Sequence, residues 1–227
     1  DPEFQPVSGP RRVEIKTDKC ATYKLIEISG VNIVASDEKI ASRLRAIGIN
    51  PKNCAVDATN YICYDMAQPM HWFDADEIHG NIIVRQADAG EKFTDLFGTE
   101  HELTTNDMVI ADEDGILALA GVIGGARGAT TEKTKNIILE SAYFDPVSVR
   151  KSAKRLGIST DASYRYERGI DPTITGIAAM CASEIIMDAC GGKIVGTYCA
   201  GTDVAPDVKI KYNPKYFMKR TLFTHMQ

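Results

Sequence analysis

The sequence lacks the features that mark several broad classes of protein. It contains no uninterrupted apolar run of about 18 or more residues, so it predicts no transmembrane helix. It has no basic start followed by an apolar stretch, so no signal peptide is visible. CxxC pairs, an HExxH segment and paired-carboxylate metal motifs are absent too. The sequence therefore predicts no metal site.

Cysteine occurs six times, but in no arrangement that suits a metal ion. No His stands at zinc-ligand spacing beside any of these residues. We therefore expect reduced, buried thiols, as in a cytosolic protein. The six are Cys20, Cys54, Cys63, Cys181, Cys190 and Cys199.

Positive charge is in deficit, because 26 Lys and Arg face 31 Asp and Glu, which gives a net charge of -5. This balance argues against a nucleic-acid binder whose whole surface is basic. Contact with RNA would need a local patch, and the sequence offers one candidate. An ordinary solvated helix face is the alternative interpretation. The patch consists of Arg150, Lys151, Lys154, Arg155, Arg165 and Arg168.

The composition that is present indicates a globular chain. With 227 residues, 44% of them hydrophobic, the chain can form one large domain or two small interlocked ones. Helical and strand patterns are mixed without a regular βαβ alternation, which predicts an α+β fold with mixed sheets and packed helices in layers. We expect residues 1–21 to be a linker or the end of a preceding domain. Residues 22–203 would form the main module, and residues 204–227 a tail or the start of a following domain.

Three helices are predicted from their apolar spacing and end signals. The first follows Ser36 as N-cap and stops at Gly48. The second opens at Asp145-Pro146 and stops at Gly157, and the third opens at Asp171-Pro172 and stops at Gly191-Gly192. Strands are predicted at residues 81–87, 108–112, 116–123, 136–144 and 193–201, with the second and third joined as a hairpin.

Two titratable residues stand out as candidates for chemistry. Glu140 lies inside an apolar strand, where a carboxylate needs hydrogen-bond donors. It is either a structural carboxylate or a pocket group that recognises a hydroxyl or amine. His71 lies beside Trp72 and Phe73. It is either a packed residue or a group that acts as base, positions water or contacts a sugar hydroxyl.

Glycine is dense between Gly121 and Gly128, where it allows close approach of backbone to a ligand or serves ordinary turns. No Gly-Lys-Ser/Thr follows, and no GxGxxG opens a helix, so neither a Walker loop nor a dinucleotide site is predicted. A loop that offers amide groups to a substrate carbonyl is one hypothesis. No nucleophile elbow is present, and no Ser-His-Asp set can be assembled.

Three long segments, in order, carry a resemblance to a known family. They are VDATNYICYDMAQPMHWFDADEI (56–78), ALAGVIGGARGATTEKTKNIILESAYF (118–144) and GISTDASYRYERGIDP (157–172). Together they resemble the editing module in the beta subunit of bacterial phenylalanyl-tRNA synthetase, from about Val31 to Gly192.

The resemblance implies roles for individual residues. The counterpart of Glu140 binds the phenol hydroxyl of tyrosine, and that of His71, the candidate catalytic residue, lies near the ester and the terminal adenosine. One departure is Asn50, where many relatives have Arg before Pro. The other pocket residues implied are Thr59, Asn60, Pro69, Ala120, Gly121, Gly124, Thr160 and Ala162.

The resemblance also implies a function, which is hydrolysis of tyrosine mischarged onto the phenylalanine tRNA. This fragment would need no cofactor and would not aminoacylate. The complete enzyme would be a cytoplasmic heterotetrameric ligase that uses ATP and magnesium, with the alpha subunit and tRNA as partners. The alternatives are a non-catalytic RNA-binding or scaffolding domain of the synthetase, and a stand-alone hydrolase or amino-acid sensor.

Overall fold

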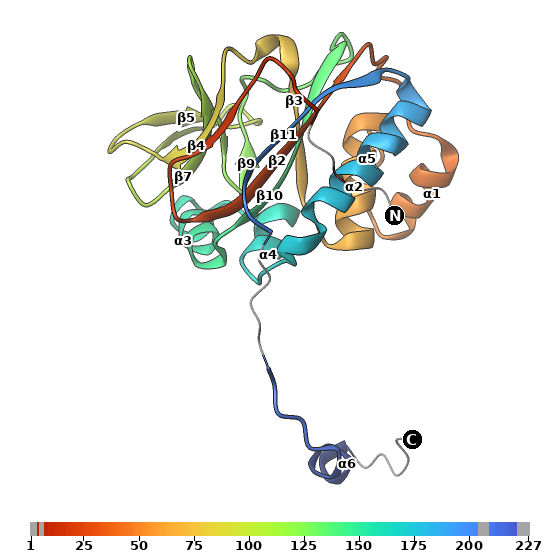
Figure 1. Cartoon of the computed structure of the whole chain (residues 1–227), viewed down its shortest axis with the longest axis vertical. Helices are drawn as coiled ribbons and strands as arrows, with labels where there is room; N and C mark the ends of the chain where they lie inside the picture. The colour runs from red at the N-terminus through yellow and green to blue at the C-terminus, as the bar shows by residue number, and fades with distance from the viewer. Residues whose placement is uncertain (1–3, 5–6, 204–208, 222–227) are drawn as a thin grey trace.

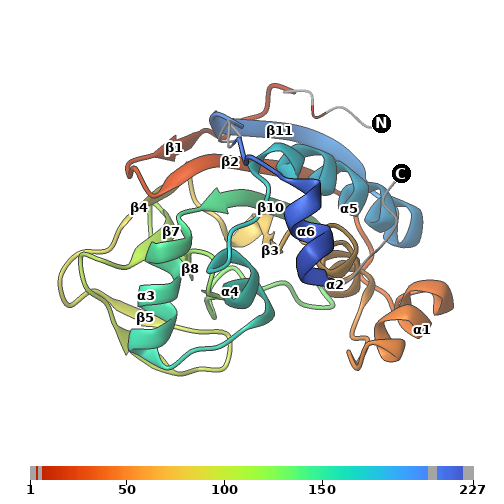
Figure 2. The same cartoon turned by 90° about the horizontal axis from the view of Figure 1, so that it is seen from below.

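The computed structural model describes residues 4, 7–203 and 209–221, and it has the α+β architecture that the sequence predicts. Figures 1 and 2 show a layered body with helices on one side of the sheets and along one edge of them. The strands are β1 (Val13–Ile15), β2 (Cys20–Ser29), β3 (Met70–Asp74), β4 (Ile82–Gln86), β5 (Lys92–Thr94), β6 (Glu100–Glu102), β7 (Met108–Asp112), β8 (Gly115–Leu119), β9 (Ile123–Gly124), β10 (Asn136–Phe144) and β11 (Lys193–Gly201). The helices are α1 (Glu38–Ala46), α2 (Cys54–Met66), α3 (Pro146–Leu156), α4 (Asp161–Tyr166), α5 (Thr175–Cys190) and α6 (Pro214–Thr221), with 3-10 turns η1 (Ala75–Glu77) and η2 (Pro172–Ile174).

A four-stranded antiparallel sheet, in the order β11-β2-β10-β3, forms the middle layer. Successive side chains of a strand point to opposite faces, so each strand supplies both neighbouring layers. In β10, Leu139 packs in the core on the helix side, whereas Ile138 packs in the core on the other side. Because β10 is buried on both faces, its sequence is almost continuously apolar, as predicted.

Helices α2 and α5 cover one face of this sheet. Trp72, Ile137 and Leu139 from the strands meet Ala178 and Ile186 of α5 in a single apolar cluster. By length and composition alone, residues 172–190 could cross a membrane, although 44% of the most apolar window is buried inside the protein. Since α5 packs on β2, β10 and α2, its apolar composition is explained by contacts within the chain.

A five-stranded sheet, in the order β1-β4-β7-β8-β9, lies on the opposite side of the middle layer. Phe73 and Leu25 from the middle sheet share a core with Ile82, Ile110 and Leu117 of this second sheet. A small hairpin of β5 and β6 extends from it. Helices α3 and α4 close the lower edge of the two sheets in Figure 1, so a pocket can form where sheets and helices meet.

The predicted helix and strand signals are largely confirmed, and several further elements were not predicted. Asp145 caps α3, and Gly157 ends it in the left-handed region with φ 69°, as the sequence predicts. The N-cap of α1 is Asp37 rather than Ser36, since the Asp37 carboxylate accepts from the Ile40 amide. Strands β1, β2, β3, β5 and β6 and helices α2, α4 and α6 were not predicted. Strand β2 carries the buried Lys24 and Glu27, whose partners Asp203 and Tyr198 lie far away along the chain.

The prediction of six reduced, buried thiols is wrong in two respects. Cys54 and Cys190 are joined as a disulfide with their Cα atoms 6.9 Å apart. Sequence spacing concealed this pair, because the first turn of α2 meets the last residue of α5 only in the folded chain. Cys199 is exposed and Cys181 is partly exposed, while Cys20 and Cys63 are buried free thiols.

The predicted domain boundaries stay a prediction. Within the predicted linker, β1 pairs in parallel with β4, and the Thr197 amide donates to the carbonyl of Val7 at 3.1 Å. In the predicted tail, residues 204–208 and 222–227 lie outside the described residues. Helix α6 lies apart from the layered body in Figure 1, and it has no buried residue.

Candidate functional site

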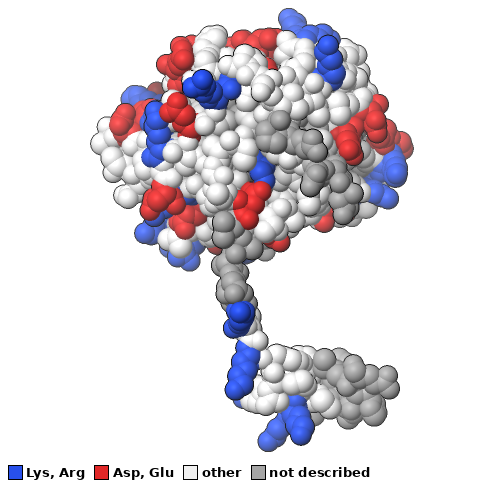
Figure 3. Space-filling model, in the orientation of Figure 1, with Lys and Arg blue, Asp and Glu red and all other residues white. Residues whose placement is uncertain are grey.

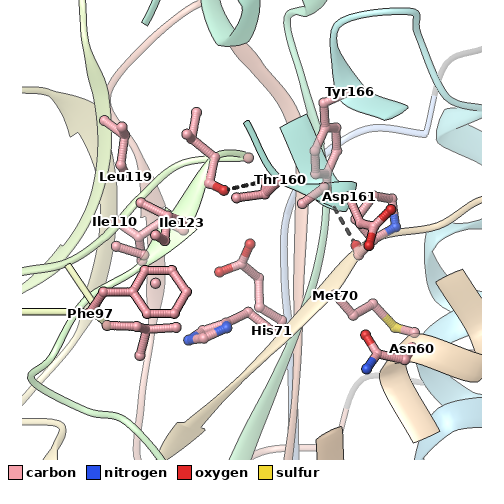
Figure 4. Close-up of a pocket in the computed structure, with 18 residues that line it drawn as sticks. Asn60, Met70, His71, Phe97, Ile110, Leu119, Ile123, Thr160, Asp161 and Tyr166 are labelled. Carbon is pink, nitrogen blue, oxygen red and sulfur yellow. Dashed lines mark hydrogen bonds between the residues drawn. The ribbon is translucent and has the colours of Figure 1, made fainter. Parts of the chain in front are cut away.

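A pocket of about 280 Å³ opens where the two sheets meet α4. Figure 4 shows its labelled side chains converging from strands, helices and loops. The lining is mostly apolar with a few convergent polar groups, as is usual for small-molecule sites. It consists of Asn60, Pro69, Met70, His71, Leu96, Phe97, Ile110, Ala118, Leu119, Gly121, Val122, Ile123, Gly124, Glu140, Thr160, Asp161, Ala162 and Tyr166.

Strand pairing brings the two candidate titratable residues together. In the antiparallel ladder of β3 and β10, His71 stands directly opposite Glu140. Directly opposed residues present their side chains on the same face, with Cβ atoms roughly 5 Å apart. This face is the one turned toward the second sheet, so both groups point into the pocket. Residues 69 positions apart in sequence thus become immediate neighbours.

Glu140 is a buried carboxyl group with one side-chain partner. It is 5% exposed, and the Tyr23 hydroxyl donates to its Oε2 across 3.0 Å. Tyr23 lies two residues before Leu25, which is the β2 residue opposite Glu140, so its ring reaches Glu140 diagonally. Burial raises the pKa of Glu140 to about 8, and the hydrogen bond from Tyr23 opposes that rise. Near neutral pH the carboxyl in this pocket is therefore mainly protonated.

His71 is a neutral imidazole at physiological pH. Burial lowers its pKa to about 4, because surrounding apolar groups disfavour the charged ring. Its ring meets Phe73 edge-on with centroids 4.7 Å apart. Among the described residues, none forms a hydrogen bond with the ring, although part of the side chain is exposed. A neutral ring with free polar atoms can accept from or donate to a bound molecule.

Two glycines of the 118–128 segment are required by the pocket wall. A Cβ at Gly124 would lie 2.5 Å from Cε1 of His71, so only glycine fits beside the imidazole. Gly121 has φ 68°, and a Cβ there would meet Phe144 and Val149 at 3.0 Å. Most amide groups that this loop could offer to a substrate carbonyl are already used within the chain. The amides of Ala120, Val122, Gly125 and Ala126 already donate to carbonyl groups of the chain.

The Thr160 side chain caps α4 as well as lining the pocket. Its oxygen accepts from the Ser163 amide at 3.0 Å, and its hydroxyl donates to the Val122 carbonyl at 2.7 Å. This second bond ties α4 to the glycine-rich wall. Ala162 follows in the first turn and lines the pocket with Asp161. Thr160 thus fixes where these small residues lie.

Two residues from the predicted set do not line the pocket. Thr59 is buried in α2, where its hydroxyl donates to the Val56 carbonyl at 2.9 Å. Ala120 belongs to the core, and its amide donates to Met108. Thr59 precedes the lining residue Asn60, and Ala120 precedes the lining residue Gly121. The sequence motif did not show which residue of each pair faces the pocket. Asn50, the departure from the family pattern, is exposed and lies outside the lining.

Several lining residues were not predicted from the sequence. Tyr166 is buried, and its hydroxyl donates to the carbonyls of Pro69 and Ala142, both at 3.1 Å. Leu96 and Phe97 come from the turn between β5 and β6. An exposed Leu-Phe pair beside a glycine in the segment DLFGT was a signal that could have marked this turn. The sequence around Ile110 gave no sign that it lines a pocket, because an isoleucine in an apolar strand is usually a core residue.

Half of the predicted basic patch is already paired with acids. Arg155 pairs with Asp107, whose side chain is 1% exposed, while Arg165 pairs with Asp161 and Arg168 with Glu167. Arg150, Lys151 and Lys154 are exposed, and no ion pair involves them in the part of the chain that the structure describes. On the face drawn in Figure 3, positive and negative groups are interspersed on the layered body.

No group of three or more His, Cys, Asp or Glu that could hold a metal ion occurs among the described residues. The pocket holds two carboxyl groups and one imidazole, and only the imidazole and Glu140 are directly opposed on paired strands.

Comparison with known proteins gives a consistent family. Residues 19–191 match the family model described as the B3/4 domain. The chain is 41% identical over 192 residues to the phenylalanine–tRNA ligase beta subunit of Cutibacterium acnes. The matched region covers 84% of this chain and 23% of that protein. It is 44% identical over 209 residues to the beta subunit of Aquifex aeolicus, which covers 92% of this chain and 26% of that protein. The chain thus spans about a quarter of the length of these relatives.

A solved structure shares the fold. It is an N-terminal fragment of the phenylalanyl-tRNA synthetase beta subunit from Pyrococcus horikoshii. The match has a TM-score of 0.54 at 15% identity and covers 99% of this chain and 63% of that one. At this identity the likeness concerns the fold alone.

Proposed function

This chain belongs to the B3/4 domain family and is similar to bacterial phenylalanine–tRNA ligase beta subunits, and on that premise we propose that its pocket hydrolyses tyrosine esterified to the phenylalanine tRNA. The observation that carries the proposal is Glu140, a buried carboxyl in a largely apolar pocket directly opposite a neutral imidazole. Tyrosine differs from phenylalanine by one hydroxyl, and Glu140 is a partner that only tyrosine can satisfy.

The selection has a clear physical basis. An apolar synthetic site rejects an added hydroxyl only by on the order of 10²-fold, so a second site has something to correct. A site built around a hydrogen-bonding group inverts the test. Phenylalanine would leave the pocket side of Glu140 without a partner, whereas the phenol of tyrosine hydrogen-bonds there. The Tyr23 hydroxyl holds Oε2, which leaves Oε1 for the substrate.

The reaction needs little from the protein beyond orientation. The oxygen of a water molecule forms a bond to the ester carbonyl carbon, and the bond from that carbon to the ribose oxygen breaks. The ribose oxygen takes up a proton, and free tyrosine and tRNA result. His71, neutral at pH 7, accepts a hydrogen bond from the water and orients it. Its pKa of about 4 makes it a weak base, so positioning is its main contribution.

The wider setting is also part of the proposal. The complete enzyme would be a cytoplasmic ligase that uses ATP and magnesium, with an alpha subunit and tRNA as partners. Its metal and nucleotide would serve aminoacylation rather than this pocket. The pocket itself would need no cofactor, because an aminoacyl ester is already activated toward water.

Release of tyrosine from Tyr-tRNA of the phenylalanine type tests the proposal. We expect this chain to accelerate the release above the rate in buffer alone, and His71→Ala to reduce the acceleration. A non-catalytic RNA-binding domain would instead bind the charged tRNA and leave the ester intact. An amino-acid sensor would bind free tyrosine and be indifferent to the tRNA. Failure of a folded chain to accelerate release at saturating concentration would contradict the proposal.

A further inference from the structure

The turn between β5 and β6 presents a large apolar ring at the mouth of the pocket. Phe97 is 83% exposed, which is high for an aromatic residue that lines a pocket. Figure 4 shows its ring facing the same space as the His71 imidazole. Its neighbour Leu96 is also exposed and also lines the pocket. The exposure of such a ring calls for an explanation in terms of what covers it.

The turn holds Phe97 in this position through a built network. The Asp95 carboxylate accepts from the amides of Phe97 at 2.8 Å and Thr99 at 3.0 Å, and it bonds Nε2 of His101 at 2.8 Å. Gly98 takes φ 82°, and its amide donates to the Asp95 carbonyl at 2.9 Å. Asp95 is buried, so the network is anchored within the fold. The network therefore fixes the backbone from which the exposed ring of Phe97 projects.

Backbone hydrogen bonding also joins this turn to the pocket wall beside His71. The Leu96 amide donates to the Gly124 carbonyl at 3.0 Å, and Asp95 forms an isolated bridge with Gly125. A Cβ built on Gly124 would lie 2.5 Å from His71 and 3.2 Å from Leu96, so these three residues adjoin. Buried Glu140, then His71, then exposed Phe97 thus define a path from the interior to the mouth.

This path orients an ester. If the phenol reaches Glu140 and the carbonyl lies beside His71, the alcohol portion of the ester leaves through the mouth next to Phe97. The lining of the pocket contains no Lys or Arg, so the mouth is not built for a phosphate. An exposed aromatic ring on a fixed backbone instead suits a flat uncharged ring, because bases stack on aromatic side chains with little regard to sequence.

We propose, on the premise of the function above, that Phe97 stacks against the base of the nucleoside that carries the ester. The ligand class is a purine or pyrimidine nucleoside esterified to an amino acid, and the contact is separate from recognition of the amino-acid side chain. Phe97 then positions the ribose relative to His71 without taking part in bond breaking.

Two synthetic esters separate the base contact from the rest of the pocket. One is 3′-O-tyrosyl-adenosine, and the other is tyrosine methyl ester, which has the same acyl group and no base. We expect Phe97→Ala to lower the ratio of kcat/KM for the nucleoside ester to that for the methyl ester by roughly 5- to 150-fold. Phe97→Trp should preserve the ratio and Phe97→Leu should lose it, because stacking needs a ring. Phe217→Ala, which removes a ring from α6 outside the pocket, is the control and should leave both rates unchanged.

A binding measurement keeps the test independent of hydrolysis. The probe is 3′-tyrosylamino-3′-deoxyadenosine, whose amide resists water, and its Kd is measured by calorimetry on this chain and on Phe97→Ala. Weaker binding to the variant supports the stacking contact even if no ester is hydrolysed, in which case only the proposed reaction fails. Equal binding to both proteins, no binding to either, or an equal loss on both esters would overturn the contact. A concentration-dependent dimer that disappears in Phe97→Ala would also overturn it, because a second copy would then be what covers the ring.

Discussion

At the scale of single residues, the proposed recognition of a hydroxyl rests on Glu140 and on the hydrogen bond that it accepts from Tyr23. Tyr23→Phe removes one hydrogen bond to Oε2 and keeps the ring that packs in the core. We expect it to lower the preference for tyrosyl over phenylalanyl ester by roughly 2- to 10-fold, since a neutral hydrogen bond contributes about 0.5–1.5 kcal/mol. The measurement is the rate ratio on the two esters, with circular dichroism to check folding. An unchanged ratio would mean that Glu140 needs no second partner.

The ionisation of Glu140 should also appear in the pH dependence of stability. Its pKa rises from 4.5 to about 8 on folding, so the folded chain binds more protons than the unfolded chain between these values. Stability due to this group is therefore fully present below about pH 4.5 and is lost as the pH rises through 8. His71 acts in a lower window, because its pKa falls from 6.5 to about 4 and its contribution is lost as the pH falls through 4.

Urea unfolding at pH 6 and pH 9 isolates the Glu140 term. The natural chain should lose more free energy of unfolding between these values than Glu140→Gln, which cannot ionise. Other groups with raised pKa, such as Cys63, are common to both proteins and cancel in the comparison. Parallel stability curves for the two proteins would show that Glu140 does not change its ionisation on folding.

His71 should affect the rate of hydrolysis more than the binding of tyrosine. Its ring adjoins Gly124 at the pocket wall and faces Glu140 across the strand pair. We expect His71→Ala to slow hydrolysis of Tyr-tRNA by about 10-fold or more, which is the low end for a group that orients a proton transfer. The Kd for free tyrosine, measured by calorimetry, should change much less. Equal losses in rate and affinity would make His71 a binding residue instead.

At the scale of elements, the basic residues of α3 fall into two groups. Arg150, Lys151 and Lys154 have no ion pair among the described residues, whereas Arg155 is paired with Asp107. Burial would raise the pKa of Asp107, but hydrogen bonds from Ser152 and Thr104 and the Arg155 charge lower it. Arg155 is thus part of the link between α3 and the loop before β7, and Arg155→Glu would place two acids together. We expect that variant to lose stability rather than to report on RNA.

The charge reversal that tests the patch therefore uses Arg150, Lys151 and Lys154. Replacing all three by Glu should weaken binding to tRNA and reduce its salt dependence, since fewer phosphates are neutralised. The free energy of unfolding should be nearly unchanged, because the three side chains are exposed. Filter binding at several salt concentrations is the measurement. An unaltered affinity would leave these residues as an ordinary solvated face.

Elements with local end signals were predictable, and those held by distant partners were not. The caps of α3 and the turn of the β7–β8 hairpin are specified by residues that are adjacent in sequence. Strand β2 contains Lys24 and Glu27, which look like surface residues in sequence. In the fold Lys24 pairs with Asp203, and Glu27 accepts from the Tyr198 hydroxyl at 2.8 Å. No local rule predicts a buried charge whose partner lies more than 170 positions away.

At the scale of the whole molecule, the pocket is assembled from segments that meet only through the layer order. Motif resemblance predicted eight of its lining residues, because those residues lie in the three matched segments. Tyr23 and Phe97 lie outside these segments. Tyr23 reaches the site because β2 pairs with β10, and Phe97 because the β5–β6 turn is fastened to Gly124. Both depend on sheet register, which the sequence alone does not specify.

The same layering supplies a matched control for the central residue. Glu27 is buried in the same sheet and accepts from a tyrosine hydroxyl, as Glu140 does, but it does not line the pocket. Glu27→Ala therefore removes a carboxyl–phenol pair elsewhere in the fold, together with the ion pair of Glu27 to Arg11 at 3.6 Å. Any effect that is common to both variants belongs to folding, and any effect confined to Glu140→Ala belongs to the pocket.

The most direct measurement is the ratio of hydrolysis rates on Tyr-tRNA and Phe-tRNA, both of the phenylalanine type, for the natural chain, Glu140→Ala and Glu27→Ala. We predict that Glu140→Ala lowers the preference for Tyr-tRNA by roughly 2- to 10-fold where the carboxyl is neutral, and by about 10- to 150-fold above pH 8 where it is charged. Glu27→Ala should keep the natural ratio. A folded Glu140→Ala variant with the natural ratio at both pH values would contradict the assignment of Glu140 as the group that selects tyrosine.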